Sequence, residues 1–99
     1  MMLVRVLTMR VVPERLDEWL RFTRDVGFPG MRRQPGCRAV WRLRRHGGDR
    51  EYQVATLWDS LADVEQFRGS EAMRELTAAG AGLTVPPPDE ALFDLIEDA

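Results

Sequence analysis

Residues 3–12 carry aliphatic side chains on both parities of an extended chain, without a regular alternation of apolar and polar positions. A strand with this pattern is covered on both faces, so the segment is predicted to be a central strand of a sheet. Arg5 is the least expected residue within it. A charge at this position must reach an end of the sheet or pair with a carboxylate.

The next segment has helical spacing. Pro13 suits a first helical position, and the pattern predicts a helix from there to about Val26. Glycine and proline within residues 27–30 are expected to end it, before a turn leads to Pro35. The positions that share one face of this helix are Leu16, Trp19, Leu20 and Thr23.

Residues 37–45 alternate in a way that predicts a half-exposed edge strand. One parity holds Cys37, Ala39, Trp41 and Leu43, and the other holds Arg38, Val40, Arg42 and Arg44. The Gly47-Gly48-Asp49 turn that follows supplies the backbone freedom of a tight hairpin, which predicts that residues 51–58 form the third strand directly after it.

Two helices and a last strand complete the pattern. Ser60 and Ser70 are expected N-caps, so that two helical pieces fill residues 61–79. Residues 82–88 include three consecutive prolines and cannot continue a helix. Residues 91–97 alternate again and are predicted to be the fourth strand.

The order βαββαβ predicts one α+β domain over residues 1–99, of the ferredoxin-like class, with helices on one face of an antiparallel sheet. The other face would be apolar and bare, which favours a homodimer with sheet packed against sheet. A further expectation is that arginines of the edge strand pair with acidic residues of the partner's last strand. The residues expected to pair are Arg38, Arg42 and Arg44 with Asp94, Glu97 and Asp98.

Composition supports a globular, cytoplasmic protein: 44% of residues are hydrophobic and 30% are charged, and the N-terminus does not resemble a secretion signal. Residues 1–50 hold twelve arginines against five acidic residues, and residues 51–99 hold two against eleven. The net charge is only −2. A protein with that balance is not expected to bind nucleic acid, and the absence of a long apolar run argues against membrane insertion.

Neither a metal nor an organic cofactor is expected. The sequence has one histidine, His46, and one cysteine, Cys37, which are too few for a typical transition-metal site. Gly80-Ala81-Gly82 is followed by Thr84 and prolines instead of opening a helix, so it is not a dinucleotide-binding loop. We expect His46 to be solvated beside the hairpin turn.

Three segments in register resemble the antibiotic biosynthesis monooxygenase superfamily. They are Val12-Pro13-Glu14 at the start of a helix, Gln34-Pro35-Gly36-Cys37 at the start of a strand, and Trp58-Asp59-Ser60 between a strand and a helix. The resemblance covers nearly the whole chain. It implies a dimeric α+β barrel with a ligand pocket in each subunit, between the helices and the sheet.

The resemblance differs among branches of the superfamily. The positions of the haem-degrading residues hold Leu7, Phe67 and Thr77, and those of the quinol monooxygenase His and Tyr hold Ala72 and Leu76, so neither set matches. In the polyketide oxygenases Trp58 matches and Arg74 matches after a small shift, whereas Val54 and Val64 replace an Asn and a Tyr. Trp58 and Arg74 are therefore the candidate catalytic residues.

The function that this implies is a cofactor-independent monooxygenase acting on an aromatic or quinol-like molecule. The protein would supply a dry cavity and a cation, Arg74 or Arg5, that faces the anion of the substrate. The aromatic side chains expected to wall the cavity are Trp19, Trp41, Trp58, Phe22, Phe28 and Phe67. One alternative is a non-catalytic dimeric small-molecule-binding or cyclase-like accessory protein on the same fold, and another is a haem-handling protein.

Overall fold

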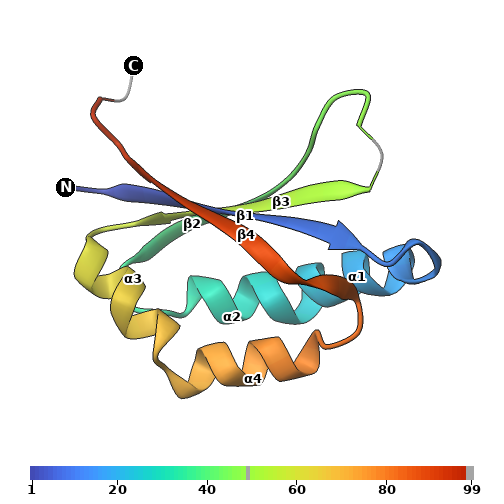
Figure 1. Cartoon of the computed structure of the whole chain (residues 1–99). Coiled ribbons are helices and arrows are strands. Elements are labelled where there is room, and N and C mark those ends of the chain that lie inside the picture. The colour runs from blue at the N-terminus through green and yellow to red at the C-terminus, as the bar shows by residue number, and fades with distance from the viewer. Residues whose placement is uncertain (49, 98–99) are drawn as a thin grey trace.

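The strands form one antiparallel sheet in the order β2-β3-β1-β4, in a computed structural model that describes residues 1–48 and 50–97 (Figure 1). The strands are β1 (Leu3–Val11), β2 (Cys37–Arg44), β3 (Glu51–Trp58) and β4 (Thr84–Asp94). β1 and β3 occupy the centre, and β2 lies at an edge, as predicted. This is the α+β ferredoxin-like arrangement expected from the element order.

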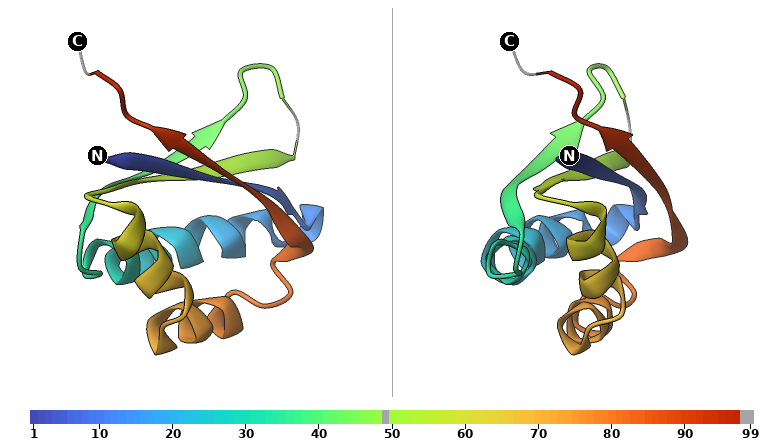
Figure 2. Two further views of the ribbon diagram at one scale, coloured as in Figure 1. Left: turned by 60° about the vertical axis from the view of Figure 1, so that its left-hand side comes forward. Right: turned by 90° about the vertical axis from the view of Figure 1, so that its left-hand side faces the viewer.

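The helical segments lie together on one side of the sheet (Figure 2). They are η1 (Pro13–Arg15), α1 (Leu16–Phe22), η2 (Thr23–Gly27), α2 (Phe28–Arg32), α3 (Leu61–Arg68) and α4 (Glu71–Ala79). Ser60 and Ser70 cap α3 and α4 as predicted, because their hydroxyls accept hydrogen bonds from the backbone N–H groups of Asp63 and Met73. Within residues 1–48 and 50–97, no helix is long and apolar enough to cross a bilayer.

The predicted end of the first helix near Val26 is wrong, because helical structure continues to Arg32. Gly27 ends η2, a π-helical turn after which the Phe28 N–H donates to the Thr23 carbonyl, and the helix continues into α2, which contains Pro29 and Gly30. Pro29 then falls in the first turn of α2, where its missing N–H breaks no helical hydrogen bond. The glycines within 27–30 therefore do not end the helix.

The fourth strand begins seven residues earlier than predicted and ends at Asp94. Its pairing with β1 shifts between Thr8 and Arg10, so that residues 86–88 all lie opposite the single residue Met9. Prolines are tolerated at such a bulge on an edge strand, because their missing N–H groups are not needed for pairing. The three prolines therefore belong to the strand that they were expected to precede.

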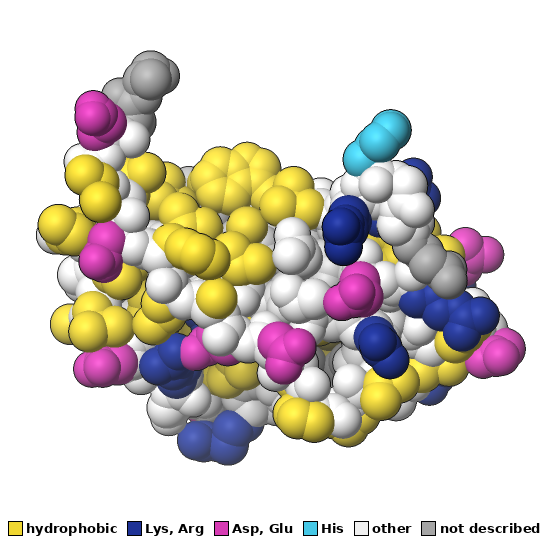
Figure 3. Space-filling view, turned by 45° about the horizontal axis from the view of Figure 1, so that its top comes forward, with side chains coloured by type: hydrophobic (Ala, Val, Ile, Leu, Met, Phe, Trp, Pro, Cys, Tyr) yellow, Lys and Arg dark blue, Asp and Glu magenta, His cyan; other side chains and the backbone are white. Residues whose placement is uncertain are grey.

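The sheet presents apolar side chains on both faces, and the described helices cover only one. On the opposite side, called the outer face from here on, Trp41 is 46% exposed and Phe93 is 55% exposed. Figure 3 shows hydrophobic side chains gathered on this side of the molecule, next to charged side chains near the β2–β3 loop. Val4 and Val6 of β1 lie between these two residues in the sheet, since Val6 pairs with Ala55 and Ala91 and Val4 with Phe93.

Two of the three edge arginines that were expected to pair with a partner's acidic residues have contacts within the chain, and the pairing between subunits stays a prediction. Arg38 donates to Asp59 of its own chain, with Nε and Oδ1 2.7 Å apart. Arg42 faces the helices, where its Nη1 donates to the Leu20 carbonyl. These donors are engaged within the chain, and Asp98 lies outside the described residues.

Gly36 precedes β2 with a φ of +83° and packs against α3, so that a Cβ would overlap the Asp63 carboxylate. We predict that Gly36→Ala lowers the free energy of unfolding by about 3 kcal/mol, through backbone strain and this overlap. Gly47, with a φ of +73° and open space around it, provides the matched control. Gly47→Ala should cost only the strain, about 1 kcal/mol. Equal losses in urea unfolding would contradict the packing of Gly36 against Asp63.

Candidate functional site

A cavity of about 510 Å³ lies between the sheet and the helices. We call it the sheet–helix pocket. It is formed by β1, β3, α1, η2, α2, α3, α4, the loop after α4 and the proline-containing start of β4. Its lining residues are Arg5, Leu7, Met9, Trp19, Phe22, Thr23, Gly27, Phe28, Met31, Val54, Phe67, Met73, Leu76, Thr77, Gly80, Ala81, Gly82, Thr84, Pro86 and Pro88.

The walls of the sheet–helix pocket are mainly aromatic and thioether groups. Four aromatic rings belong to Trp19, Phe22, Phe28 and Phe67, and three thioethers belong to Met9, Met31 and Met73. Aromatic faces and edges pack well on flat rings, and methionine side chains adapt to irregular shapes. The pocket therefore suits a flat, largely apolar molecule.

The π-helical segment η2 forms one wall and is tied to the edge strand by Arg42. The Thr23 hydroxyl donates to the Trp19 carbonyl at 2.9 Å and accepts from Arg42 Nη1 at 2.8 Å. The same Nη1 donates to the Leu20 carbonyl at 3.0 Å, at the turn where the helix widens. Single π-helical turns often occur at functional sites. Here the turn places Thr23, Gly27 and Phe28 in the lining.

Arg5 is the one charged side chain in the lining, as far as residues 1–48 and 50–97 are concerned. Its position on β1 turns it toward the helices, and only 4% of it is exposed. Its Nε donates to Glu90 Oε2 on β4 at 2.6 Å, and its Cζ lies 6.0 Å from the centre of the Phe67 ring. The sequence expectation that Arg5 pairs with a carboxylate is thus confirmed.

Two cations share the Glu90 carboxylate, because Arg68 at the end of α3 also donates to it through Nε and Nη2. Burial, together with repulsion from Arg68, lowers the pKa of Arg5 to about 10. Arg5 therefore stays protonated at neutral pH. A fixed positive charge faces an otherwise apolar cavity.

Trp58, the first candidate catalytic residue, is fully buried outside the pocket lining. Its Nε1 donates to the Thr56 hydroxyl at 2.7 Å, and its ring stacks on Phe67 at 5.4 Å between centres. Trp58 therefore supports the pocket wall from behind. It contacts a lining residue without reaching the cavity.

Arg74, the second candidate, lies on the exposed side of α4 and outside the lining. Its Nη2 donates to Glu71 Oε2 at 2.6 Å, one helical turn away. The structure does not bring Arg74 and Trp58 together. A catalytic role for either residue stays a prediction from the resemblance.

Of the six aromatic residues expected to wall a cavity, four line the pocket, whereas Trp41 lies on the outer face and Trp58 behind Phe67. Sequence reasoning missed the contributions of Arg42, Thr23 and Glu90. Besides the resemblance and the aromatic residues, the arginine inside an apolar strand was the signal in the sequence that pointed to this site.

The described residues contain no group of three His, Cys, Asp or Glu side chains placed to hold a metal ion. The Gly80–Gly82 loop follows α4 at the edge of the pocket, where Arg15 Nη1 donates to the Gly82 carbonyl at 3.1 Å. This loop shapes the pocket wall.

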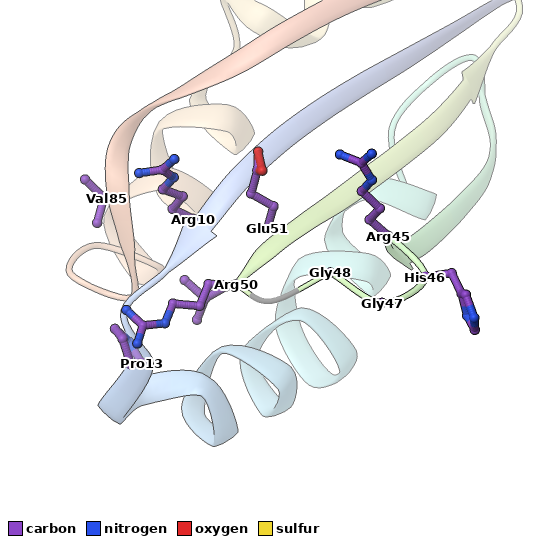
Figure 4. A pocket seen from close by; sticks show the side chains of 10 residues that line it. Arg10, Pro13, Arg45, His46, Gly47, Gly48, Arg50, Glu51 and Val85 are labelled. Carbon is purple, nitrogen blue, oxygen red and sulfur yellow. The ribbon is translucent and has the colours of Figure 1, made fainter.

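A second, larger cavity of about 690 Å³ lies at the β2–β3 loop and includes Arg10, Arg45, Arg50 and Glu51 (Figure 4). Arg10, Glu51 and Arg45 extend from the same side of the strands, and His46 points away from them (Figure 4). His46 is exposed, as predicted. The lining of this cavity is charged, so the sheet–helix pocket, with its mainly apolar and aromatic lining, is the better candidate for a small-molecule site.

A family model for antibiotic biosynthesis monooxygenases matches residues 2–79. The chain therefore belongs to the antibiotic biosynthesis monooxygenase family, as its motifs suggested. No functionally curated protein matches the sequence.

Solved structures share the fold at low sequence identity. One of them is a protein from Bordetella bronchiseptica that carries the name of an antibiotic biosynthesis monooxygenase. It superimposes with a TM-score of 0.85 at 19% sequence identity, with 94% of this chain and 95% of that chain covered. Rv0793 from Mycobacterium tuberculosis has a TM-score of 0.79 at 18% identity, with coverage of 100% and 99%. A variant of SnoaB, a cofactor-independent oxygenase from Streptomyces nogalater, has a TM-score of 0.74 at 17% identity, with coverage of 98% and 95%.

The tie between Arg42 and η2 predicts that Thr23→Val lowers the free energy of unfolding by about 1.5 kcal/mol, because Arg42 loses a hydroxyl acceptor while side-chain shape is kept. Thr77→Val provides the control on α4. The Thr77 side chain also lines the pocket but makes no hydrogen bond to the described residues, so the change should stay within about 0.5 kcal/mol. Equal effects in chemical unfolding would argue against the tie.

Proposed function

We propose that the protein is a cofactor-independent monooxygenase acting on an aromatic or quinol-like small molecule. The sheet–helix pocket carries this proposal, because it combines an aromatic, mainly apolar cavity with one buried cation. Family membership and the fold shared with SnoaB support it. The walls would exclude water and orient the substrate, and Arg5 would hold its anionic part.

The electrons in the proposed reaction come from the substrate. A quinol that loses a proton can pass an electron to O₂, and the two radicals then combine at a ring carbon. One oxygen atom stays on the ring, the other leaves as water, and the quinol becomes a hydroxyquinone. No external reductant is consumed, so the protein needs to provide only a dry cavity, orientation and charge.

A second candidate is a non-catalytic binding or cyclase-like accessory protein. It is favoured by the composition of the lining, which contains no Asp, Glu, His, Cys or Tyr in the described chain. Proton abstraction by a side chain in the cavity would need such a group. Under this alternative the same pocket binds the aromatic molecule without turnover.

Oxygen uptake with a panel of quinols and hydroxylated anthracenes tests the proposal. We expect the wild-type protein, with a metal chelator present and no added flavin, to consume one O₂ for each molecule of one substrate class. Met73→Trp should lower kcat/KM at least about tenfold, because the larger ring fills the pocket. Met73→Leu keeps the volume nearly constant and serves as the control.

A flat oxygen trace across the panel would contradict the monooxygenase proposal and favour the binding protein. The same assay tests Trp58 and Arg74, the two candidate catalytic residues that the family resemblance suggested. Loss of oxygen uptake in Trp58→Phe or Arg74→Ala, with thermal unfolding unchanged, would support a catalytic role for that residue.

We further propose that the protein works as a homodimer through the outer face. Several large apolar side chains are exposed there, and a patch of this kind favours association. Besides Trp41 and Phe93, these side chains include Leu43 at 44% exposure and Val85 at 55%. Packing two such faces together would cover the second apolar side of β1.

Trp41→Glu places a charge among these exposed apolar side chains and should shift the protein toward the monomer at micromolar concentration. Sedimentation velocity measures the change. Leu61→Glu is the matched control, because Leu61 is 45% exposed but starts α3 on the other side of the sheet. A wild-type monomer, or dissociation by Leu61→Glu alone, would refute this interface.

A further inference from the structure

We propose that the ligand of the sheet–helix pocket carries a carboxylate, which binds end-on to the two terminal nitrogens of Arg5, Nη1 and Nη2. This inference rests on the proposed function in one respect only: both take the sheet–helix pocket as the ligand site. It adds the chemical class of the ligand, a flat aromatic carboxylic acid.

The first argument is the hydrogen bonding of Arg5. Its Nε is used by Glu90, whereas Nη1 and Nη2 donate to no acceptor in residues 1–48 and 50–97. In the same described chain, no fully buried side-chain nitrogen or oxygen lacks a partner. The two terminal nitrogens of this nearly buried residue must therefore reach open space, and Arg5 lines the pocket. Four N–H donors are available to a ligand.

The second argument is the charge around Glu90. Two guanidinium groups, those of Arg5 and Arg68, share this single carboxylate, which leaves one positive charge in excess at the pocket wall. Arg68 is partly exposed, so water screens part of this charge, whereas an anion beside the nearly buried Arg5 interacts with it more strongly than in water. The excess charge favours a monoanionic ligand.

The third argument is geometric. The Nη1 and Nη2 groups of an arginine form a planar fork that matches the two oxygens of a carboxylate. A carboxylate has only two oxygens, and this fork alone satisfies both of them. The remaining walls are mainly apolar and aromatic, which fits a ring system attached to the carboxylate.

Glu90 acts here as a positioning residue. Because it accepts from Nε at 2.6 Å, it fixes the plane of the guanidinium while leaving the terminal nitrogens toward the pocket. Phe67 lies below the same guanidinium, with its own ring backed by Trp58. The fork is therefore held in place before a ligand arrives.

Isothermal titration calorimetry with anthracene-2-carboxylate and anthracene-2-carboxamide tests the proposal, since the two probes have the same shape and differ in charge. We expect the full-length protein to bind the carboxylate at least about tenfold more tightly. Arg5→Met should remove this preference while leaving the affinity for the carboxamide within about threefold. Arg24→Met is the control, because Arg24 is exposed and pairs with Asp25 on the surface.

Arg5→Lys covers the case in which Arg5→Met does not fold, as judged by circular dichroism. Lysine keeps the charge without the planar fork, so carboxylate affinity should fall by at least about threefold. Equal binding of both probes by the wild type, an unchanged preference in the Arg5 variants, or binding of neither probe would overturn the proposal. Because calorimetry needs no turnover, a carboxylate preference without oxygen uptake would refute only the monooxygenase, and the converse would refute only this proposal.

Discussion

The central strand β1 is apolar on both faces, while the described helices cover only one of them, and this constraint organises the molecule. On the helix side, Leu7 and Met9 contribute to the base of the sheet–helix pocket. On the outer face, Val4 and Val6 continue a patch that residues 1–48 and 50–97 leave uncovered. Burial of apolar area drives both consequences: the helices close over one face, and the other favours a second copy.

The same strand carries the charge that gives the pocket its polarity. Arg5 is stabilised by a carboxylate 85 positions later in the chain, and Arg68 from a third element shares it. Burying an arginine beside an apolar cavity is costly unless it is paired, and the pairing here engages only Nε. Because the two terminal nitrogens of Arg5 remain available in this apolar pocket, it is suited to a ligand with one anionic group and an aromatic body.

Much of the fold could be predicted because local patterns agreed with it. The alternation of residues 37–45, the two serine caps and the apolar central strand led to the correct elements and topology. The continuation of the helix past Val26 could not be predicted, because it depends on a π-helical turn that places Pro29 in the first turn of α2. The sequence suggested that Arg5 could need a carboxylate partner, but it did not identify Glu90. Their contact depends on the register of β1 with β4.

The indole N–H signals of the three tryptophans give the most direct measurement of where a ligand binds. Trp19 lines the pocket, Trp58 packs behind Phe67, and Trp41 lies on the outer face. In a ¹H–¹⁵N NMR titration with an aromatic ligand, the signal of Trp19 should shift in a saturable way while that of Trp41 stays in place. A saturable shift of Trp41 with Trp19 unchanged would place the ligand on the outer face and contradict the pocket as the functional site.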